Sequence, residues 1–504
     1  KVSRYLEAIT MSDVVLFIFS IVTWGIIFSA PRNGYVSAAI CLVLNLTLRY
    51  LYMKFLDPYF VYGKLKKLKV KTTWFAAAAK NVDTSMGPLS VFYKRMRPHL
   101  VVEDTSLIRT IQFLQTDRQV FDYVPGIRRN FFETFAKSIK GDTTREDREL
   151  AQSVVETVME HPRLARTYKL ALDRINTCVK DLDKTMDDDL LGSLLLNFPI
   201  EVRKMAVRTL SYCYFGRDYE ILVDDVFQMK IYELLNRISL DKFVRRVVGI
   251  NDFDWTRGFR SLGHDFVYKR VEDFEKKGEK QLEDSDILNL MIDVALEKAK
   301  LKHMVVSQQF RDECLAQIWF GMYGISSVVS TIFFYLFEEE NSDAKRDIMK
   351  EIKRIQDLVK EDDDKLIEEV NKSSVFDGMI LEALRINTAF PTFDRESVLE
   401  TTMHDQKIST STVFHLASGL ALDKTGEFDS PSEFNPKRPN LAVNRSEINL
   451  SWGESRYFAR DFIANIAKLF TFRLLPSFDF ELSDAARRSG IIAEEGIMET
   501  FTVT

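Results

Sequence analysis

The chain has 504 residues, of which 46% are hydrophobic, and its formal net charge is −5. This length suits one large domain or two to three ordinary ones, and the weak acidity excludes a nucleic acid as the expected partner. Glycine (20) and proline (12) are scarce, which favours helices over a turn-rich β architecture. The 4 cysteines form no CxxC pair, so neither a disulfide framework nor a metal site is expected.

Two uncharged apolar segments lie near the beginning of the sequence. Residues 14–30 are at the lower end of the length that a transmembrane helix needs, and 35–48 form a second, shorter run. A lysine-rich stretch follows at 64–71, and such stretches stay in the cytosol and attract anionic lipid headgroups. We therefore expect residues 1–55 to be a membrane anchor in contact with lipids. It is either a helical hairpin or one span followed by a buried helix.

Residues 56–504 contain no internal repeat and no low-complexity linker, which predicts a single domain. The longest apolar stretch, 311–336, predicts a central buried helix, and a further membrane span is the alternative. An amphipathic helix is predicted at 379–390, and short alternating runs after Pro391 predict strands. The expected fold class is mainly α with a small β part.

Four features follow one another in the second half of the chain. The central apolar helix contains a glycine near its middle. The next helix contains Glu382 and Arg385, which are three residues apart and therefore share a face where their charges can pair. The segment PSEFNPKR then ends at Arg438, and a polar loop around Gly453 leads into a helix with apolar periodicity.

In this order the four features resemble the cytochrome P-450 superfamily, the haem-thiolate monooxygenases. The stretches SPSEFNPKRP and ARDFIANIAKLFTFRLLPSFDFEL are most similar to fungal members. The resemblance covers most of the chain from residue 56 and implies the P-450 fold. It also implies that Glu382, Arg385 and Arg438 form an internal ion triad, which stabilises a protein only if its buried charges are fully paired.

Two positions depart from the pattern of that family. The position of the haem-ligating cysteine is Tyr457 in this chain, and no cysteine follows Cys314. In the central helix, the acid–alcohol pair that relays protons to iron-bound oxygen is replaced by Ser326 and Ser327. Because both parts of oxygen activation are changed, we expect a different reaction and no cofactor. A haem ligated by the phenolate of Tyr457 is the alternative.

The candidate site residues come from the central helix, the predicted strands and the loop before the last helix. Hydroxyls of the central helix either line a ligand cavity or bond back to carbonyls one turn earlier. The resemblance also implies a propionate-binding arginine at Arg395, ten residues after Arg385. The candidate acid–base groups are Tyr457, His415 and Arg395, and the expected substrate-binding residues are Tyr323, Ser326, Ser327, Phe390 and Phe393, beside Tyr457.

These inferences predict a membrane-anchored P-450-fold protein of secondary metabolism that lacks the haem thiolate and binds a lipophilic terpenoid or polyketide intermediate. A preformed cavity promotes a redox-neutral cyclisation, rearrangement or isomerisation by holding a reactive conformer. One alternative is a non-catalytic pseudoenzyme that carries substrate or supports a partner enzyme of the same pathway. The other is a monooxygenase with a tyrosine-ligated haem. The main domain is expected on the cytosolic side of the endoplasmic reticulum membrane.

Overall fold

The structure is a computed structural model, and the residues that it describes fall into ranges along the chain. The predicted membrane anchor, 1–55, lies outside them. The described residues are 66–67, 89–94, 97–117, 121–122, 153–162, 164–187, 194–216, 286–299, 308–387, 393–403, 406–410, 412–416, 428–448, 460–484 and 501–503, with the single residues 268, 272 and 487.

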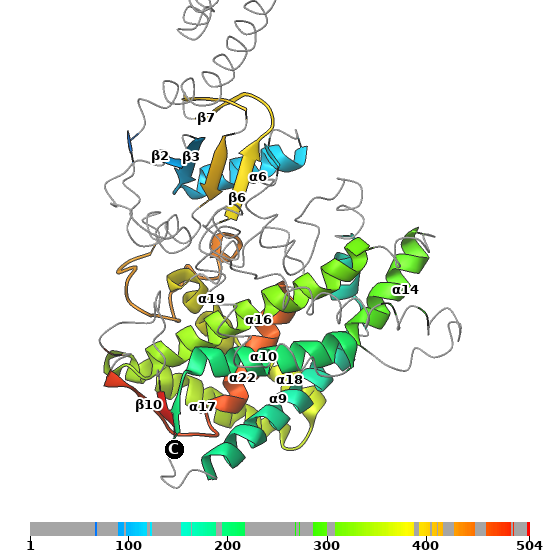
Figure 1. Ribbon diagram of the computed structural model, residues 1–504. Helices are drawn as coiled ribbons and strands as arrows, with labels where there is room; N and C mark the ends of the chain where they lie inside the picture. The colour runs from blue at the N-terminus through cyan, green and yellow to red at the C-terminus, as the bar shows by residue number, and fades with distance from the viewer. Residues whose placement is uncertain are drawn as a thin grey trace, which may run out of the picture.

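Four helices pack against one another and form the centre of the helical part (Figure 1). Helix α16 passes between α10 and α22, and Gly321 marks the closest approach. A Cβ atom on Gly321 would lie 2.6 Å from Ile463 of α22 and 2.8 Å from Leu210 of α10, which explains the glycine near the middle of this helix. The four helices are α9 (Leu164–Asp187), α10 (Phe198–Phe215), α16 (Gln308–Leu336) and α22 (Arg460–Leu474).

The helix predicted over 311–336 is α16, and its middle is enclosed by the core. Ile325, Val328 and Ile332 are each 0% exposed. No helix within the described part of the chain, α16 included, is long and apolar enough to cross a membrane.

Helix α10 has clear start and stop signals in the sequence. The side chain of Asn197 accepts a hydrogen bond from Ile200 N, and Pro199 lies in the first turn, where its missing N–H costs nothing. Gly216 ends the helix with φ of 67°, a left-handed conformation that glycine adopts without strain.

Further helices pack around this group. The helix predicted at 379–390 is α19, which ends at Ile386 because Asn387 leaves helical geometry ahead of Pro391. The further helices are α14 (Ile287–Ala299), η4 (Glu339–Asn341), α17 (Ser342–Val359), α18 (Asp363–Lys372), α19 (Ser374–Ile386) and α21 (Arg445–Ile448). Helix α6 (Thr105–Asp117) lies apart from them, beside the six-stranded sheet.

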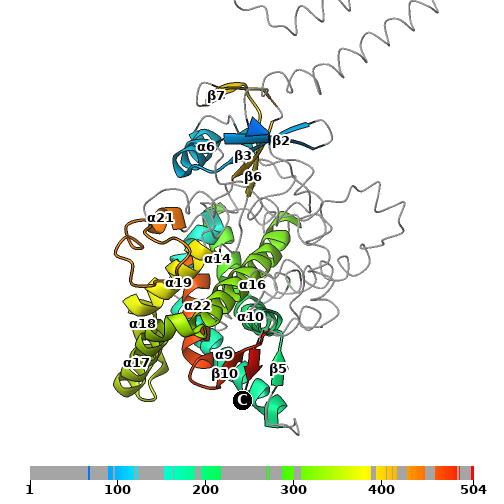
Figure 2. The same ribbon diagram turned by 90° about the vertical axis from the view of Figure 1, so that its left-hand side faces the viewer.

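A six-stranded sheet with α6 lies at one end of the molecule, away from the central helices (Figures 1 and 2). Its strand order is β1-β2-β3-β9-β6-β4, in which β3 and β9 are parallel and β6 and β9 are antiparallel. The strands are β1 (Lys66–Lys67), β2 (Leu89–Lys94), β3 (Arg97–Val102), β4 (Phe121–Asp122), β6 (Phe393–Ser397) and β9 (Val413–Leu416).

Two smaller sheets complete the β part. An aromatic cluster joins the three-stranded sheet to the helices, because the Phe198 ring lies 4.7 Å from that of Phe333 and 5.1 Å from that of Phe501. The three-stranded sheet has the order β10-β11-β5, and β7 pairs with β8. These strands are β5 (Leu194–Leu196), β7 (Thr401–Met403), β8 (Gln406–Ile408), β10 (Phe480–Leu482) and β11 (Phe501–Val503). The predicted fold class, mainly α with a small β part, is confirmed.

Candidate functional site

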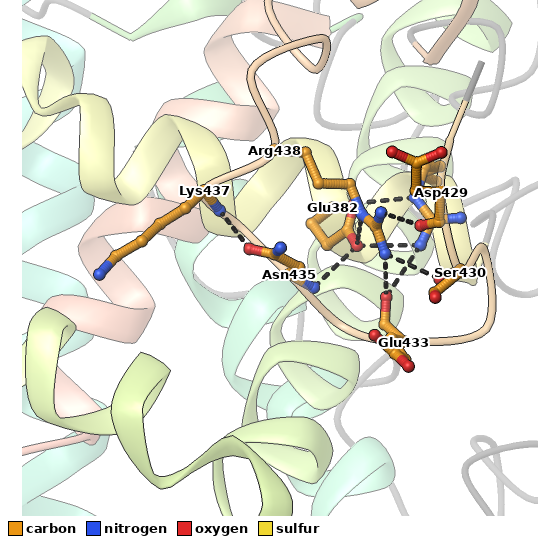
Figure 3. Close-up of polar contacts among 8 residues, drawn as sticks. Glu382, Asp429, Ser430, Glu433, Asn435, Lys437 and Arg438 are labelled. Carbon is orange, nitrogen blue, oxygen red and sulfur yellow. Dashed lines mark hydrogen bonds and ion pairs between the residues drawn. The ribbon is translucent and has the colours of Figure 1, made fainter.

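The structure brings Glu382, Arg385 and Arg438 together in the interior, between α19 and the loop that begins at Phe428 (Figure 3). Arg385 Nε donates to Glu382 Oε2 at 2.8 Å, and Arg438 Nε donates to Glu382 Oε1 at 3.0 Å. Glu382 is 0% exposed and Arg385 is 1% exposed. Water therefore does not solvate these charges, and the carboxylate and the two guanidinium groups stabilise one another.

Main-chain groups of the loop complete the pairing (Figure 3). Asn435 N donates to Glu382 Oε1 at 2.9 Å, which gives the carboxylate oxygen a second donor. The two arginines donate to loop carbonyls, which belong to Asp429, Ser430 and Glu433. The triad thus fastens the loop to α19 and has a structural role.

A glycine allows the loop to lie directly on α19. A Cβ atom on Gly378 would lie 2.3 Å from the carbonyl oxygen of Pro436, which is far inside van der Waals contact. The backbone of the loop and that of the helix therefore touch beside the triad, and any larger residue at 378 pushes them apart.

The hydroxyls of α16 serve contacts between helices. Ser326, 3% exposed, donates through Oγ to the carbonyl of Pro199 in the first turn of α10 at 2.7 Å. Thr331 donates to the Ser327 carbonyl one turn earlier at 2.7 Å and accepts from Asn387 Nδ2 at 2.9 Å. Back-bonding, the alternative from the sequence, therefore holds for Thr331, whereas Ser326 links α16 to α10.

Tyr323 lies on α16 about one turn before Ser326 and also meets α10. The guanidinium carbon of Arg203 lies 4.9 Å from the centre of the Tyr323 ring, within the range of a cation–π contact. Ser326 and Tyr323 thus both contact the face of α10 that starts at Pro199. No feature of the sequence singled out Pro199 or Arg203, because apolar residues lie on all sides of the central part of α16 and do not show which side meets α10.

Arg395 and His415 are both buried in the six-stranded sheet, at 2% and 3% exposure. Arg395 on β6 is paired with Phe414 on β9, so these two side chains lie on the same face of the sheet. His415 follows Phe414 and points to the opposite face. The structure therefore does not bring these two candidate acid–base groups to one site.

The other predicted site residues are described only in part. Phe390 and Tyr457 lie outside the described residues, and Phe393 begins β6 without a described side chain. That Tyr323, Ser326, Ser327, Phe390, Phe393 and Tyr457 bind substrate stays a prediction. Within the described residues, no three His, Cys, Asp or Glu side chains gather as a metal site.

The Cytochrome P450 family model matches residues 53–454, which is more than half of the chain. The chain belongs to this family. The match includes α16 and the ion triad, and it stops short of Tyr457. No curated protein matches the chain.

Family membership corrects the expectation about the cofactor. We expected no haem, and this expectation is wrong, because P450 proteins normally bind haem and the match points to haem as the cofactor. The expectation equated the loss of the oxygen-activating groups with the loss of the haem. These are separate losses, since oxygen ligands such as a tyrosine phenolate also hold haem iron.

The family resemblance places a contact to a haem carboxylate at Arg395. This arginine is buried in the six-stranded sheet, at 2% exposure. A guanidinium group can donate two parallel hydrogen bonds to a carboxylate, which suits a haem propionate. The thiolate ligand typical of the family has no counterpart, because no cysteine follows Cys314.

Proposed function

We propose that this chain is a haem-binding P450-family enzyme that carries out a redox-neutral rearrangement, cyclisation or isomerisation of a lipophilic small molecule, such as a terpenoid or polyketide intermediate. The observation that supports it is the hydrogen bond from Ser326 Oγ to the Pro199 carbonyl, at 2.7 Å. At that position the family resemblance places the acid that relays protons to bound oxygen.

Ser326 is poorly suited to replace that acid. Its hydroxyl is buried, at 3% exposure, and its proton already lies in a bond to a main-chain carbonyl of another helix. Giving up the proton would break this bond and create an alkoxide in an apolar core, which is costly. The next turn of α16 is also hydrogen-bonded, because the Thr331 hydroxyl donates to the Ser327 carbonyl. A reaction that needs no delivery of protons to oxygen is compatible with this arrangement.

Residues of the chain would hold the haem and orient the substrate. Arg395 would bind a haem carboxylate, and Tyr457 stands where the family has its ligand. A phenolate ligand requires a lowered tyrosine pKa, which the neighbouring cations Arg456 and Arg460 favour. When bound, the haem supplies a Lewis-acidic iron toward an oxygen atom of the substrate.

We propose that residues 1–55 anchor the protein in the endoplasmic reticulum membrane with the main domain in the cytosol, so that a lipophilic substrate reaches the site from the bilayer. The two apolar segments and the lysine-rich stretch after them support this arrangement.

The reaction class can be tested with the full chain in detergent, supplied with haem and given farnesol or geranylgeraniol as probes. One reaction contains isotopically labelled molecular oxygen, NADPH and a P-450 reductase, and the other is run under argon without NADPH. We expect products with the mass of the probe and equal yields in both reactions. Products that form only in air and carry the labelled oxygen would contradict the proposal. Binding of the probes without any turnover would favour the pseudoenzyme alternative.

Substitution at Ser327 tests the predicted substrate site. Ser327 is half-buried on α16, and Ser327→Phe places a large ring there without removing the bond of Ser326. We expect the variant to fold, by circular dichroism, and to lose turnover or probe binding by roughly tenfold or more. Ser330→Ala, on the same helix but outside the predicted substrate site, is the control, and we expect it to keep activity. Full activity of Ser327→Phe would place the site elsewhere.

A further inference from the structure

Arg203 of α10 is a cation with enclosed hydrogen-bond donors that meet no acceptor. Its Nε and Nη1 atoms are shielded from solvent, and neither finds a hydrogen-bond partner among the described residues. The side chain as a whole is half-buried, so another part of it borders solvent. A buried donor of a charged group is costly without an acceptor, and such a group in a folded protein calls for an explanation.

The neighbouring cations of α10 have acidic partners. Lys204 Nζ lies 2.8 Å from Glu201 Oε1. Arg208 Nη1 lies 3.5 Å from Asp181 Oδ2 of α9. Glu201 is two residues from Arg203, so the two side chains do not face each other on the helix. No carboxylate of the described part of the chain pairs with Arg203, and its positive charge is therefore not balanced by a neighbour.

Arg203 lies between two points at which α10 and α16 touch, and the two helices run side by side (Figure 1). In the first turn of α10, the Pro199 carbonyl accepts from Ser326 Oγ at 2.7 Å. Further along α10, Leu210 packs against α16. Between these contacts, the guanidinium carbon of Arg203 lies 4.9 Å from the centre of the Tyr323 ring. The backbone is fixed on both sides, so the guanidinium group is positioned before a ligand binds.

The Tyr323 ring compensates the charge of Arg203 only in part. An aromatic face attracts a cation, but it is a weaker acceptor for N–H groups than an oxygen atom. A guanidinium group presents its donors in a planar fork that matches two oxygen atoms of a carboxylate or phosphate, and ionised acceptors form the strongest hydrogen bonds of this kind. An oxyanion would therefore satisfy both the donors and the charge.

We propose that Arg203 and the ring of Tyr323 form a binding site for a carboxylate or phosphate group at the contact between α10 and α16. The anion approaches the side of Arg203 that borders solvent. A turn of the guanidinium group brings an enclosed donor to the anion, since no hydrogen bond holds that donor in place. The anion is either free in solution or the polar end of a lipophilic molecule. Only the second source rests on the proposed function.

Isothermal titration calorimetry of the full chain in detergent, at constant ionic strength, tests the site with inorganic phosphate and with acetate as probes. Arg203→Met keeps the apolar stem and removes the charge. We expect it to bind the preferred anion roughly tenfold more weakly than the wild type, because charge-assisted hydrogen bonds are lost. The control is Arg208→Met on the same helix, whose arginine already has an acidic partner, and its affinity should equal that of the wild type.

Two results of this titration would overturn the proposal. One is a wild type that binds neither anion, and the other is equal affinity of the wild type and a folded Arg203→Met. Arg203→Lys covers the case in which Arg203→Met does not fold, because it keeps a cation beside the Tyr323 ring. A lysine lacks the fork, so its affinity should fall severalfold. Wild-type affinity in Arg203→Lys would contradict recognition by the fork.

Thermal denaturation separates a binding role of Arg203 from a structural one. Without anion, Arg203→Met should unfold close to the wild-type temperature, because the lost cation–π contact is offset by the removal of donors without acceptors. A ligand that binds only the folded state raises the melting temperature. Phosphate should therefore stabilise the wild type and Arg208→Met more than it stabilises Arg203→Met. An equal response of all three proteins would assign Arg203 a structural role and overturn the site.

Farnesyl phosphate and farnesol distinguish the two sources of the anion. Wild type and variant are compared in the same detergent, so that partition into micelles cancels. If the anion is the end of a lipophilic molecule, Arg203→Met should weaken farnesyl phosphate roughly tenfold and leave farnesol unchanged. If only inorganic phosphate or acetate depends on Arg203, the site takes a free anion, and the site then stands even where the proposed function fails. Dependence of none of these anions on Arg203 would overturn the site itself.

Discussion

The ion triad on α19 and the hydroxyl groups of α16 are polar clusters enclosed by the same apolar core, but the triad is charged and the hydroxyl groups are neutral. At the triad, Glu382 keeps a full charge that meets two guanidinium groups and the Asn435 amide. On α16, the place of a family acid is taken by Ser326, whose neutral hydroxyl bonds to α10. The two clusters therefore differ in charge, because the triad keeps paired ions in the interior and Ser326 forms a neutral contact between helices.

Breaking the triad should produce the largest loss of stability. Arg385→Ala removes one of the two guanidinium partners of the buried Glu382 carboxylate and breaks the triad, which costs about 3–5 kcal/mol. The matched control is Arg346→Ala on α17, where the arginine is 61% exposed and its loss is worth little. Chemical denaturation of both variants checks the difference. An Arg385→Ala protein as stable as the control would mean that the triad does not support the fold.

The contact of the loop with α19 gives a second, smaller effect. In Gly378→Ala the new methyl group meets the Pro436 carbonyl, and the loop must shift away from the helix, at a cost of about 1–3 kcal/mol. Gly216→Ala is a useful comparison, because there the strain comes from φ of 67° and not from a neighbouring atom. The melting temperature of Gly378→Ala should fall, and the absence of any fall would show that loop and helix are further apart.

Ser326→Ala sharpens the comparison between the two clusters. The substitution removes the side-chain donor to the Pro199 carbonyl, at a cost of about 1 kcal/mol, which is less than the loss of an ionic partner. Ser330→Ala is the control on the same helix, because Ser330 Oγ has no hydrogen-bond partner among the described residues. The melting temperature of Ser326→Ala should therefore be lower than that of Ser330→Ala. Equal stability of the two variants would mean that the Ser326 bond contributes nothing.

The smallest effect concerns Glu351 on α17 and depends on pH. The Glu351 carboxylate accepts from Arg354 at 2.8 Å and from Ser373 at 2.6 Å, and chiefly the arginine lowers its pKa below the ordinary value. A lowered pKa stabilises the fold above the ordinary pKa of a glutamate, and this contribution is lost as the pH falls through the folded-state pKa.

Glu351→Gln should therefore cost about 0.5 kcal/mol near neutral pH, because Arg354 is half exposed, and the difference from wild type should vanish in acid. Chemical denaturation of both proteins near neutral pH and in acid measures this difference in the free energy of unfolding. If the stability difference between the wild type and Glu351→Gln increased as the pH fell, this would contradict a lowered pKa of Glu351.

Local rules were sufficient for some of these features. Glu382 and Arg385 are three residues apart on a predicted helix, so their pairing follows from helix geometry. The buried, mainly helical fold follows from the long apolar segments and the scarcity of glycine and proline. The family resemblance added Arg438, because no local pattern connects a loop arginine to a glutamate on a distant helix.

Long-range packing explains what could not be predicted. The sequence of α16 is apolar on every side, so it does not reveal that Ser326 meets α10. Likewise, Arg395 and His415 were grouped by residue type, whereas the register between β6 and β9 places them on opposite faces. The expectation of no haem failed for a different reason, because it inferred the absence of a cofactor from changes in only two of its neighbours.

The absorbance spectrum of the full chain, loaded with haem and passed through gel filtration, tests the account most directly. The central claim is that the chain has kept the scaffold that holds haem while the oxygen-activating groups have changed. It predicts a Soret band in proportion to protein, at one haem per chain, with the spectrum of an oxygen-ligated rather than a thiolate-ligated iron. A folded protein that retains no Soret absorbance would contradict it.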